Sequence, residues 1–274
     1  MNNYKLTISY DGTRYHGWQS QKHTDGTIQQ KLEDLISRFL GEKVELCGSG
    51  RTDAGVHAAA QIANFKTKQE LSINELQQSF YDYLPQDIMV TEIVPVSERF
   101  HARLSAKAKW YRYTIYNSPK LNVFERQYVW HLPEQLNIAA MEQAAEYLKG
   151  EHDFISFCSN KRMKKSSVRR VSDIRFVIEP VLAGNRIHID YYGDGFLYNM
   201  VRILTGTLVE VGQGKKQPLQ MPDILAACNR QCAGMTAPPM GLKLMEVYYD
   251  ARVKRSKCRS CLHDKAFELG THQT

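Results

Sequence analysis

Residues 47–58 read CGSGRTDAGVHA, a stretch in which three glycines and an arginine surround a single carboxylate, Asp53. Clusters of this kind are ordinarily surface turns, in which glycine supplies positive φ angles at low steric cost. On that interpretation Gly48, Gly50 and Gly55 have positive φ angles and Asp53 is a turn residue. The alternative is a loop that holds Asp53 for chemistry, and the rest of the sequence must decide between the two.

The segments around this loop alternate between strand and helix patterns. Alternating or apolar runs predict strands at 4–10, 43–47, 56–65, 88–94, 109–117, 171–178, 186–192 and 243–249, and helical spacing predicts helices at 28–39, 73–84, 137–150, 196–212 and 222–228. Asp53 therefore lies on a strand-to-strand connection, where a rigid sheet can hold a functional loop. The order lacks a regular βαβ alternation, which predicts an α+β fold with an antiparallel sheet.

The chain is long enough for one large domain or two halves, at 274 residues. The polar stretch 99–108 predicts the crossing between halves at 1–104 and 105–250, followed by a basic tail at 251–274. No run approaches the roughly 18 apolar residues of a membrane span. The N-terminus, MNNYKLTISYDG, lacks a basic and then apolar signal region, which predicts a cytoplasmic protein.

The charge of the chain favours a polyanionic partner, since 36 basic against 29 acidic residues give a net +7. KRMKKSSVRR (161–170) holds six basic residues and ARVKRSKCRS (251–260) holds five, with no acid in either. Each run is either a solvated loop or a phosphate-binding segment. With 15 Tyr and 3 Trp available for stacking on bases, the second interpretation gains weight and predicts contact with nucleic acid.

Six cysteines in a cytoplasmic chain of this size do not predict a disulfide framework. Cys258, Cys261 and His263 have the spacing of zinc ligands, and Cys228 with Cys232 could complete a set. Because the CxxC has no matching partner CxxC, we predict that this cluster holds no metal needed for activity.

Two further side chains allow either a structural or a chemical interpretation. Arg202 lies in the apolar segment GFLYNMVRILTGTL (195–208), where it either extends to solvent or holds an ionised carboxylate in bidentate geometry. Tyr111 of WYRY shares one strand face with Tyr113. That face is either core or a stacking platform for a flipped-out base.

Taken together, these motifs resemble one family. GSGRTDAGVHA is accompanied by YDGTRYHGWQ (10–19), RFHAR (99–103), KWYRY (109–113), GDGFLYNMVR (193–202) and GLKLMEVYY (241–249). The set resembles the tRNA pseudouridine synthase A family in register from about residue 4 to residue 250. The tail after Asp250 is not part of the resemblance.

The resemblance implies an enzyme that isomerises uridine to pseudouridine at positions 38 to 40 of the tRNA anticodon stem-loop, without a cofactor. It implies two related ferredoxin-like α+β halves that form a continuous antiparallel sheet flanked by helices, with a central cleft, in a homodimer. It also implies that Asp53 is the catalytic residue, that Tyr111 lies by the target base, that Arg202 pairs with Asp53 and that Arg51 assists in displacing the base.

This chemistry accounts for the residue types. The N1–C1′ bond must break, the uracil must rotate, and C5 must bond to the same carbon, with an ionised carboxylate as nucleophile, electrostatic partner or base. Burial would raise the pKa of Asp53, and Arg202 would oppose that rise. One alternative is a non-catalytic RNA-binding protein, which has no use for a lone carboxylate in a cleft. A glycoside hydrolase is another, but it usually needs two carboxylates.

Overall fold

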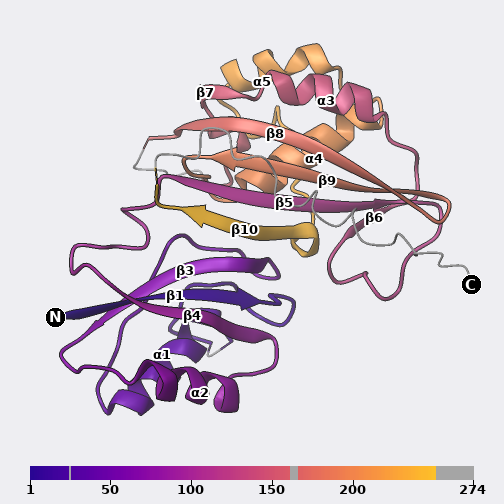
Figure 1. Ribbon diagram of the computed structural model, residues 1–274. Coiled ribbons are helices and arrows are strands. Elements are labelled where there is room, and N and C mark those ends of the chain that lie inside the picture. The colour runs from indigo at the N-terminus through magenta and orange to yellow at the C-terminus, as the bar shows by residue number, and fades with distance from the viewer. Residues whose placement is uncertain (25, 161–165, 251–274) are drawn as a thin grey trace, which may run out of the picture.

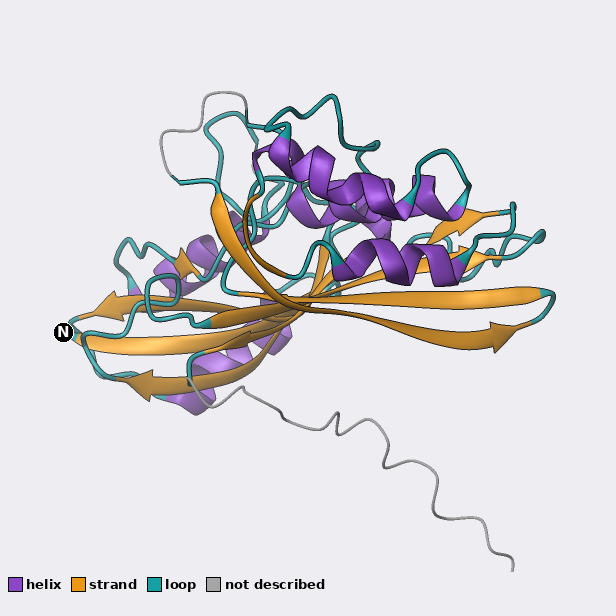
Figure 2. Cartoon of the chain, turned by 90° about the horizontal axis from the view of Figure 1, so that it is seen from above, coloured by secondary structure: helices purple, strands orange, loops and turns teal. Residues whose placement is uncertain are grey.

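One twisted sheet of ten strands runs through the whole protein in the computed structural model, which describes residues 1–24, 26–160 and 166–250 (Figure 1). Its strands are β1 (Asn2–Tyr10), β2 (Cys47–Gly48), β3 (His57–Thr67), β4 (Ile88–Val96), β5 (Ala108–Asn117), β6 (Trp130–Leu132), β7 (Gly150–Asp153), β8 (Val168–Val181), β9 (Gly184–Gly193) and β10 (Leu242–Tyr248). The main path of the sheet is β4-β1-β3-β10-β5-β9-β8-β7. Seen from above, the strands form a continuous band across the molecule (Figure 2).

The two ends of this sheet repeat one strand order. On one side the order is β4-β1-β3-β2, and on the other it is β10-β5-β9-β8. In each half, the strand that comes first in the sequence, β1 or β5, lies inside the set and not at its edge, as in the ferredoxin-like β-α-β-β-α-β motif. The predicted fold class is therefore confirmed, and two pairs depart from the antiparallel pattern, since β10 is parallel to β3 and β6 is parallel to β5. The boundary at residue 104 stays a prediction.

Five helices within the described residues accompany the two halves: α1 (Ile28–Leu40), α2 (Ile73–Tyr83), α3 (Ile138–Glu146), α4 (Met200–Gly212) and α5 (Met221–Ala226). Helices α1 and α2 lie beside the N-terminal strands, and α3, α4 and α5 lie beside the C-terminal strands (Figure 1). Short 3₁₀ helices lie at Ile155–Phe157, Pro218–Gln220 and Pro239–Gly241.

Helix α1 shows how local sequence sets these elements. Its apolar residues recur every three or four positions, so Ile28, Leu32 and Ile36 are buried on one face. The Thr27 side chain accepts a hydrogen bond from the backbone N–H of Gln30, and Gly41 ends the helix in the left-handed conformation. Both ends agree with the sequence-based prediction.

Helix α4 carries Arg202 through the C-terminal core. The apolar run predicted a helix from residue 196, but the helix begins at Met200 because Asn199 adopts a left-handed conformation with φ of 61°. Almost every side chain of α4 is buried, and the hydroxyls of Thr205 and Thr207 bond back to carbonyls four residues earlier.

Other predicted elements differ in extent. The predicted strand 43–47 shrinks to Cys47–Gly48, because β2 and β10 share one edge of β3, with β2 opposite Asn64 and Ala63 and β10 opposite His57 and Ala58. The helix predicted to end at Gly150 stops at Glu146, and Gly150 opens β7. Strands β6 and β7 were not predicted, since three or four residues give no periodic signal.

The predicted tail 251–274, with Cys258, Cys261 and His263, lies outside the described residues. Within the described part of the chain, no cluster of three or more His, Cys, Asp or Glu side chains has the arrangement of a metal site. No helix there is long and apolar enough to cross a membrane.

Strand β10 joins the two halves, so a cavity at its centre should weaken the whole fold. Leu244 is buried there, opposite Ala58 of β3 and Tyr111 of β5. We expect Leu244→Ala to lower the free energy of unfolding by about 2–5 kcal/mol in urea titrations. The exposed Leu219→Ala should change it by less than about 0.5 kcal/mol. Equal effects of the two variants would contradict the packing of β10.

Candidate active site

The loop from Ser49 to Val56 connects β2 to β3 at the junction of the halves. It is held by the preceding segment YDGTRYHGW, because the backbone N–H of Trp18 donates to the Thr52 carbonyl at 3.1 Å and the N–H of Gly55 donates to the Tyr15 carbonyl at 3.3 Å. Two motifs that are separate in the sequence thus form one packed unit that fixes the position of Asp53.

The glycines of the loop serve packing more than backbone conformation. Gly55 has a φ of 77°, as predicted, but Gly48 and Gly50 do not have positive φ, so the prediction was wrong for both. A Cβ on Gly48 would lie 2.5 Å from Nε1 of Trp18, and one on Gly50 would lie 2.5 Å from Nζ of Lys109. These glycines are therefore required by neighbouring side chains.

Asp53 meets Arg202 across the junction. Nη1 of Arg202 donates to Oδ2 of Asp53 at 3.2 Å, and the two side chains are 15% and 19% exposed. Arg202 also donates through Nε to the Ala237 carbonyl at 2.8 Å and through Nη1 to Oδ1 of Asn199 at 2.9 Å. The contact with the carboxylate is a single hydrogen bond, because the guanidinium is shared among three acceptors, and the expected bidentate geometry is absent.

Two opposing effects set the acidity of Asp53. Burial disfavours the charged carboxylate and raises its pKa, whereas the charge of Arg202 and its hydrogen bond lower it. Burial is the larger effect, so the pKa of Asp53 lies above its ordinary value. Arg202 limits this rise and favours the ionised form.

A cavity of about 680 Å³ opens over this pair and is lined by residues of both halves. Asp53 and Tyr111 line it, and the Tyr111 ring packs edge-on against Phe196 with the centroids 5.3 Å apart. Burial raises the pKa of the Tyr111 hydroxyl, which therefore stays neutral. Arg51 is exposed at the rim and donates from Nε to Oε1 of Gln19 at 3.0 Å. Arg202 contacts Asp53 but is not among the described residues that line the cavity.

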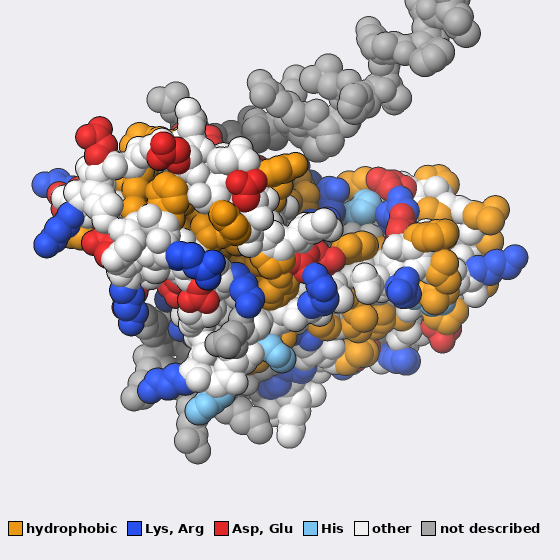
Figure 3. All heavy atoms as spheres, turned by 90° about the horizontal axis from the view of Figure 1, so that it is seen from below, with side chains coloured by type: hydrophobic (Ala, Val, Ile, Leu, Met, Phe, Trp, Pro, Cys, Tyr) orange, Lys and Arg blue, Asp and Glu red, His pale blue; other side chains and the backbone are white. Residues whose placement is uncertain are grey.

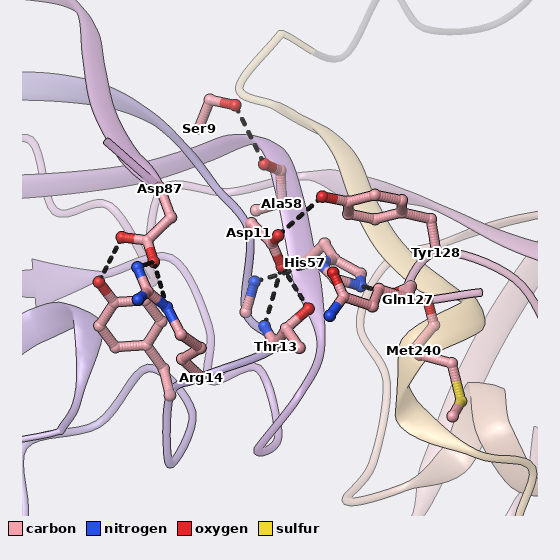
Figure 4. Close-up of polar contacts among 12 residues, drawn as sticks. Ser9, Asp11, Thr13, Arg14, His57, Ala58, Asp87, Gln127, Tyr128 and Met240 are labelled. Carbon is pink, nitrogen blue, oxygen red and sulfur yellow. Dashed lines mark hydrogen bonds and ion pairs between the residues drawn. The ribbon is translucent and has the colours of Figure 1, made fainter. Parts of the chain in front are cut away.

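Sequence reasoning assigned no role to His57, which follows the loop at the start of β3. Its ring is buried, Nδ1 accepts the N–H of Gly12 at 3.1 Å, and Nε2 lies 3.1 Å from the carbonyls of Gln127 and Met240 (Figure 4). Burial lowers the pKa of His57, and the charge of Asp11 opposes this effect. His57 thereby ties the loop to the C-terminal half, a role that no local pattern reveals.

The carboxylate of Asp11 also lies at this contact between His57 and the C-terminal half. Oδ1 of Asp11 lies 3.1 Å from Nδ1 of His57, and Oδ2 accepts a hydrogen bond from the Tyr128 hydroxyl at 2.8 Å (Figure 4). The rings of Tyr128 and His57 also pack, with centroids 5.2 Å apart. The YDG motif therefore contributes to the contact between the halves.

Comparison with known proteins identifies the family of the chain. The sequence model of a family described as tRNA pseudouridine synthase matches residues 6–104 and 144–250. The chain belongs to the tRNA pseudouridine synthase family. It is 44% identical over 249 residues to a tRNA pseudouridine synthase A of Ruminiclostridium cellulolyticum, and the match spans 91% of this chain and 100% of that protein. A protein of the same name from Acetivibrio thermocellus is 45% identical with the same coverage.

The pairing of Arg202 with Asp53 predicts a coupled effect on stability. We expect Arg202→Met to lower the free energy of unfolding by about 2–4 kcal/mol at neutral pH, because it leaves a buried carboxylate without its cation. Adding Asp53→Asn should restore part of that loss, with a coupling of about 1–2 kcal/mol in a double-mutant cycle measured by urea unfolding.

The same cycle has a defined pH dependence. As pH falls through the raised pKa of Asp53, the carboxylate of the wild type is protonated and its attraction to Arg202 is lost, so the stability gap between wild type and Arg202→Met should narrow. Additive effects that do not change with pH would contradict the pairing.

Proposed function

We propose that this chain isomerises uridine to pseudouridine in tRNA, at positions 38 to 40 of the anticodon stem-loop, as a cytoplasmic homodimer. Membership of the tRNA pseudouridine synthase family supports the reaction. The observation that carries the proposal is a largely buried carboxylate, Asp53, which is the only acidic side chain among the described residues that line the cavity and which pairs with Arg202. A protein that only binds RNA has no need of such a group.

The reaction leaves the composition of the nucleotide unchanged. The N1–C1′ bond breaks with its electron pair left on the uracil, the uracil rotates, and C5 bonds to C1′. The hydrogen on C5 then leaves as a proton, and N1 gains one. An ionised Asp53 can attack C1′ as a nucleophile or remove a proton from C2′, and both routes require the charged form that Arg202 favours.

The cavity suits a single nucleotide extruded from its helix. Its volume of about 680 Å³ falls within the range of small-ligand pockets and is too small for a duplex. The target uridine must then leave the stack, as in other enzymes that act on a base. In the proposal, the ring of Tyr111 stacks on the extruded uracil, and Arg51, exposed at the rim, occupies the space that the base leaves.

Two exposed arginines flank the cavity. Arg51 and Arg103 are exposed beside the cavity and are suited to phosphate contacts. On the face seen in Figure 3, by contrast, acidic, basic and hydrophobic side chains are intermixed. The basic run 161–170 is described only from residue 166, and its contribution to tRNA binding stays a prediction.

Substitution of Asp53 tests the function directly. We expect Asp53→Asn and Asp53→Glu to bind tRNA within a few-fold of wild type and to release no tritium from tRNA that carries 5-tritiated uridine, because the first lacks the charge and the second moves it by about one methylene. The exposed Asp82→Asn, in α2, is the matched control and should retain full activity.

Two results would overturn the proposal. Wild-type protein that binds tRNA without releasing tritium would favour the RNA-binding alternative. Activity of Asp53→Asn above about one per cent of wild type would exclude the carboxylate as the reacting group, since loss of a reacting group costs several orders of magnitude.

A further inference from the structure

A partly buried lysine, Lys109, lines the same cavity as Asp53 and has no assigned role. It stands two residues before Tyr111 on β5, so both side chains emerge on one face of the strand. Nζ of Lys109 donates to the Ser49 carbonyl at 2.9 Å, at the start of the loop that holds Asp53. Gly50 leaves room for the ammonium group, since a Cβ there would lie 2.5 Å from Nζ. The lysine head group is thus fitted against the loop.

The charge of Lys109 is uncompensated within the described residues, where none of the ion pairs includes it. Its charged neighbours are Arg103 and Arg169, which are also cationic. Burial first, and these two arginines second, lower the pKa of Lys109 to about 8. A partly buried cation without an anionic partner is costly, and a substrate that brings negative charge into the cavity would relieve that cost.

We propose that Lys109 is a catalytic residue whose ammonium group donates a hydrogen bond to the uracil as the N1–C1′ bond breaks. This inference rests on the proposed function. In that step the bonding electron pair remains on the uracil, and the negative charge spreads over its ring and carbonyl oxygens. A uracil stacked on Tyr111 presents its edge to the side chain two residues away on the same strand face. Lys109 keeps its proton throughout, and its charge stabilises the leaving group as an oxyanion-hole donor does.

A tRNA phosphate is the other anion that could meet this cation. A contact with phosphate contributes to tRNA affinity in the ground state. A contact with the uracil instead raises the reaction rate, because the uracil becomes negative only during the reaction. The lower exposure of Lys109 favours the uracil, since the exposed Arg103 at the same cavity is better placed for the phosphate backbone.

The experiment compares Lys109→Met with Arg103→Met in single-turnover tritium release and in tRNA binding. We expect Lys109→Met to slow the rate about 100-fold to 1,000-fold with the tRNA Kd within about threefold of wild type. Arg103→Met should weaken tRNA binding, which is the effect expected of a phosphate contact. A Lys109→Met rate within tenfold of wild type, or a loss confined to Kd, would overturn the proposal.

The pH profile separates catalysis from a purely structural role. The wild-type rate should fall as pH rises through about 8, where Lys109 loses its proton. Lys109→Arg keeps its charge, so its descending limb should move to higher pH, and this comparison stands even if Lys109→Met does not fold. An unchanged limb near pH 8 in Lys109→Arg would overturn the inference. Failure of the wild type to release tritium would instead overturn the proposed function.

Discussion

The contact between Arg202 and Asp53 is the interaction on which the site depends. The two residues are 149 positions apart, and they meet at 3.2 Å because the loop after β2 and the start of α4 face each other across the junction. Burial raises the pKa of the carboxyl and the guanidinium opposes this rise, so Asp53 is both buried and paired with a cation only where both halves are in place. The site is therefore a product of the complete fold.

The topology makes that dependence unavoidable. Strand β10, the last described strand of the chain, fills the position between β3 and β5, and its parallel pairing with β3 sets the two halves in register. His57, at the first residue of β3, bonds to Gln127 and Met240 of the other half. Any variant that loosens β10 should therefore disturb the Asp53 loop as well.

Local patterns predicted the elements well, and tertiary contacts decided the rest. Helix α1 could be predicted with both ends because its capping residues are neighbours in sequence. The packing roles of Gly48 and Gly50 could not, because Trp18 and Lys109 lie 30 and 59 positions away. The chemistry of a buried arginine predicted that Arg202 pairs with a carboxylate, and the family resemblance identified that carboxylate as Asp53. Only the structure shows that the two share a single hydrogen bond. Lys109 gave no signal because its burial and neighbours come from other segments.

The most direct measurement is a crystal structure of Asp53→Asn bound to a tRNA anticodon stem-loop. The account predicts one uridine from positions 38 to 40 extruded into the cavity, with its base on Tyr111 and C1′ about 3.5 Å from the side chain at position 53. A stem-loop bound with all three nucleotides still stacked, or with only phosphates beside position 53, would contradict the claim that this carboxylate acts on the sugar.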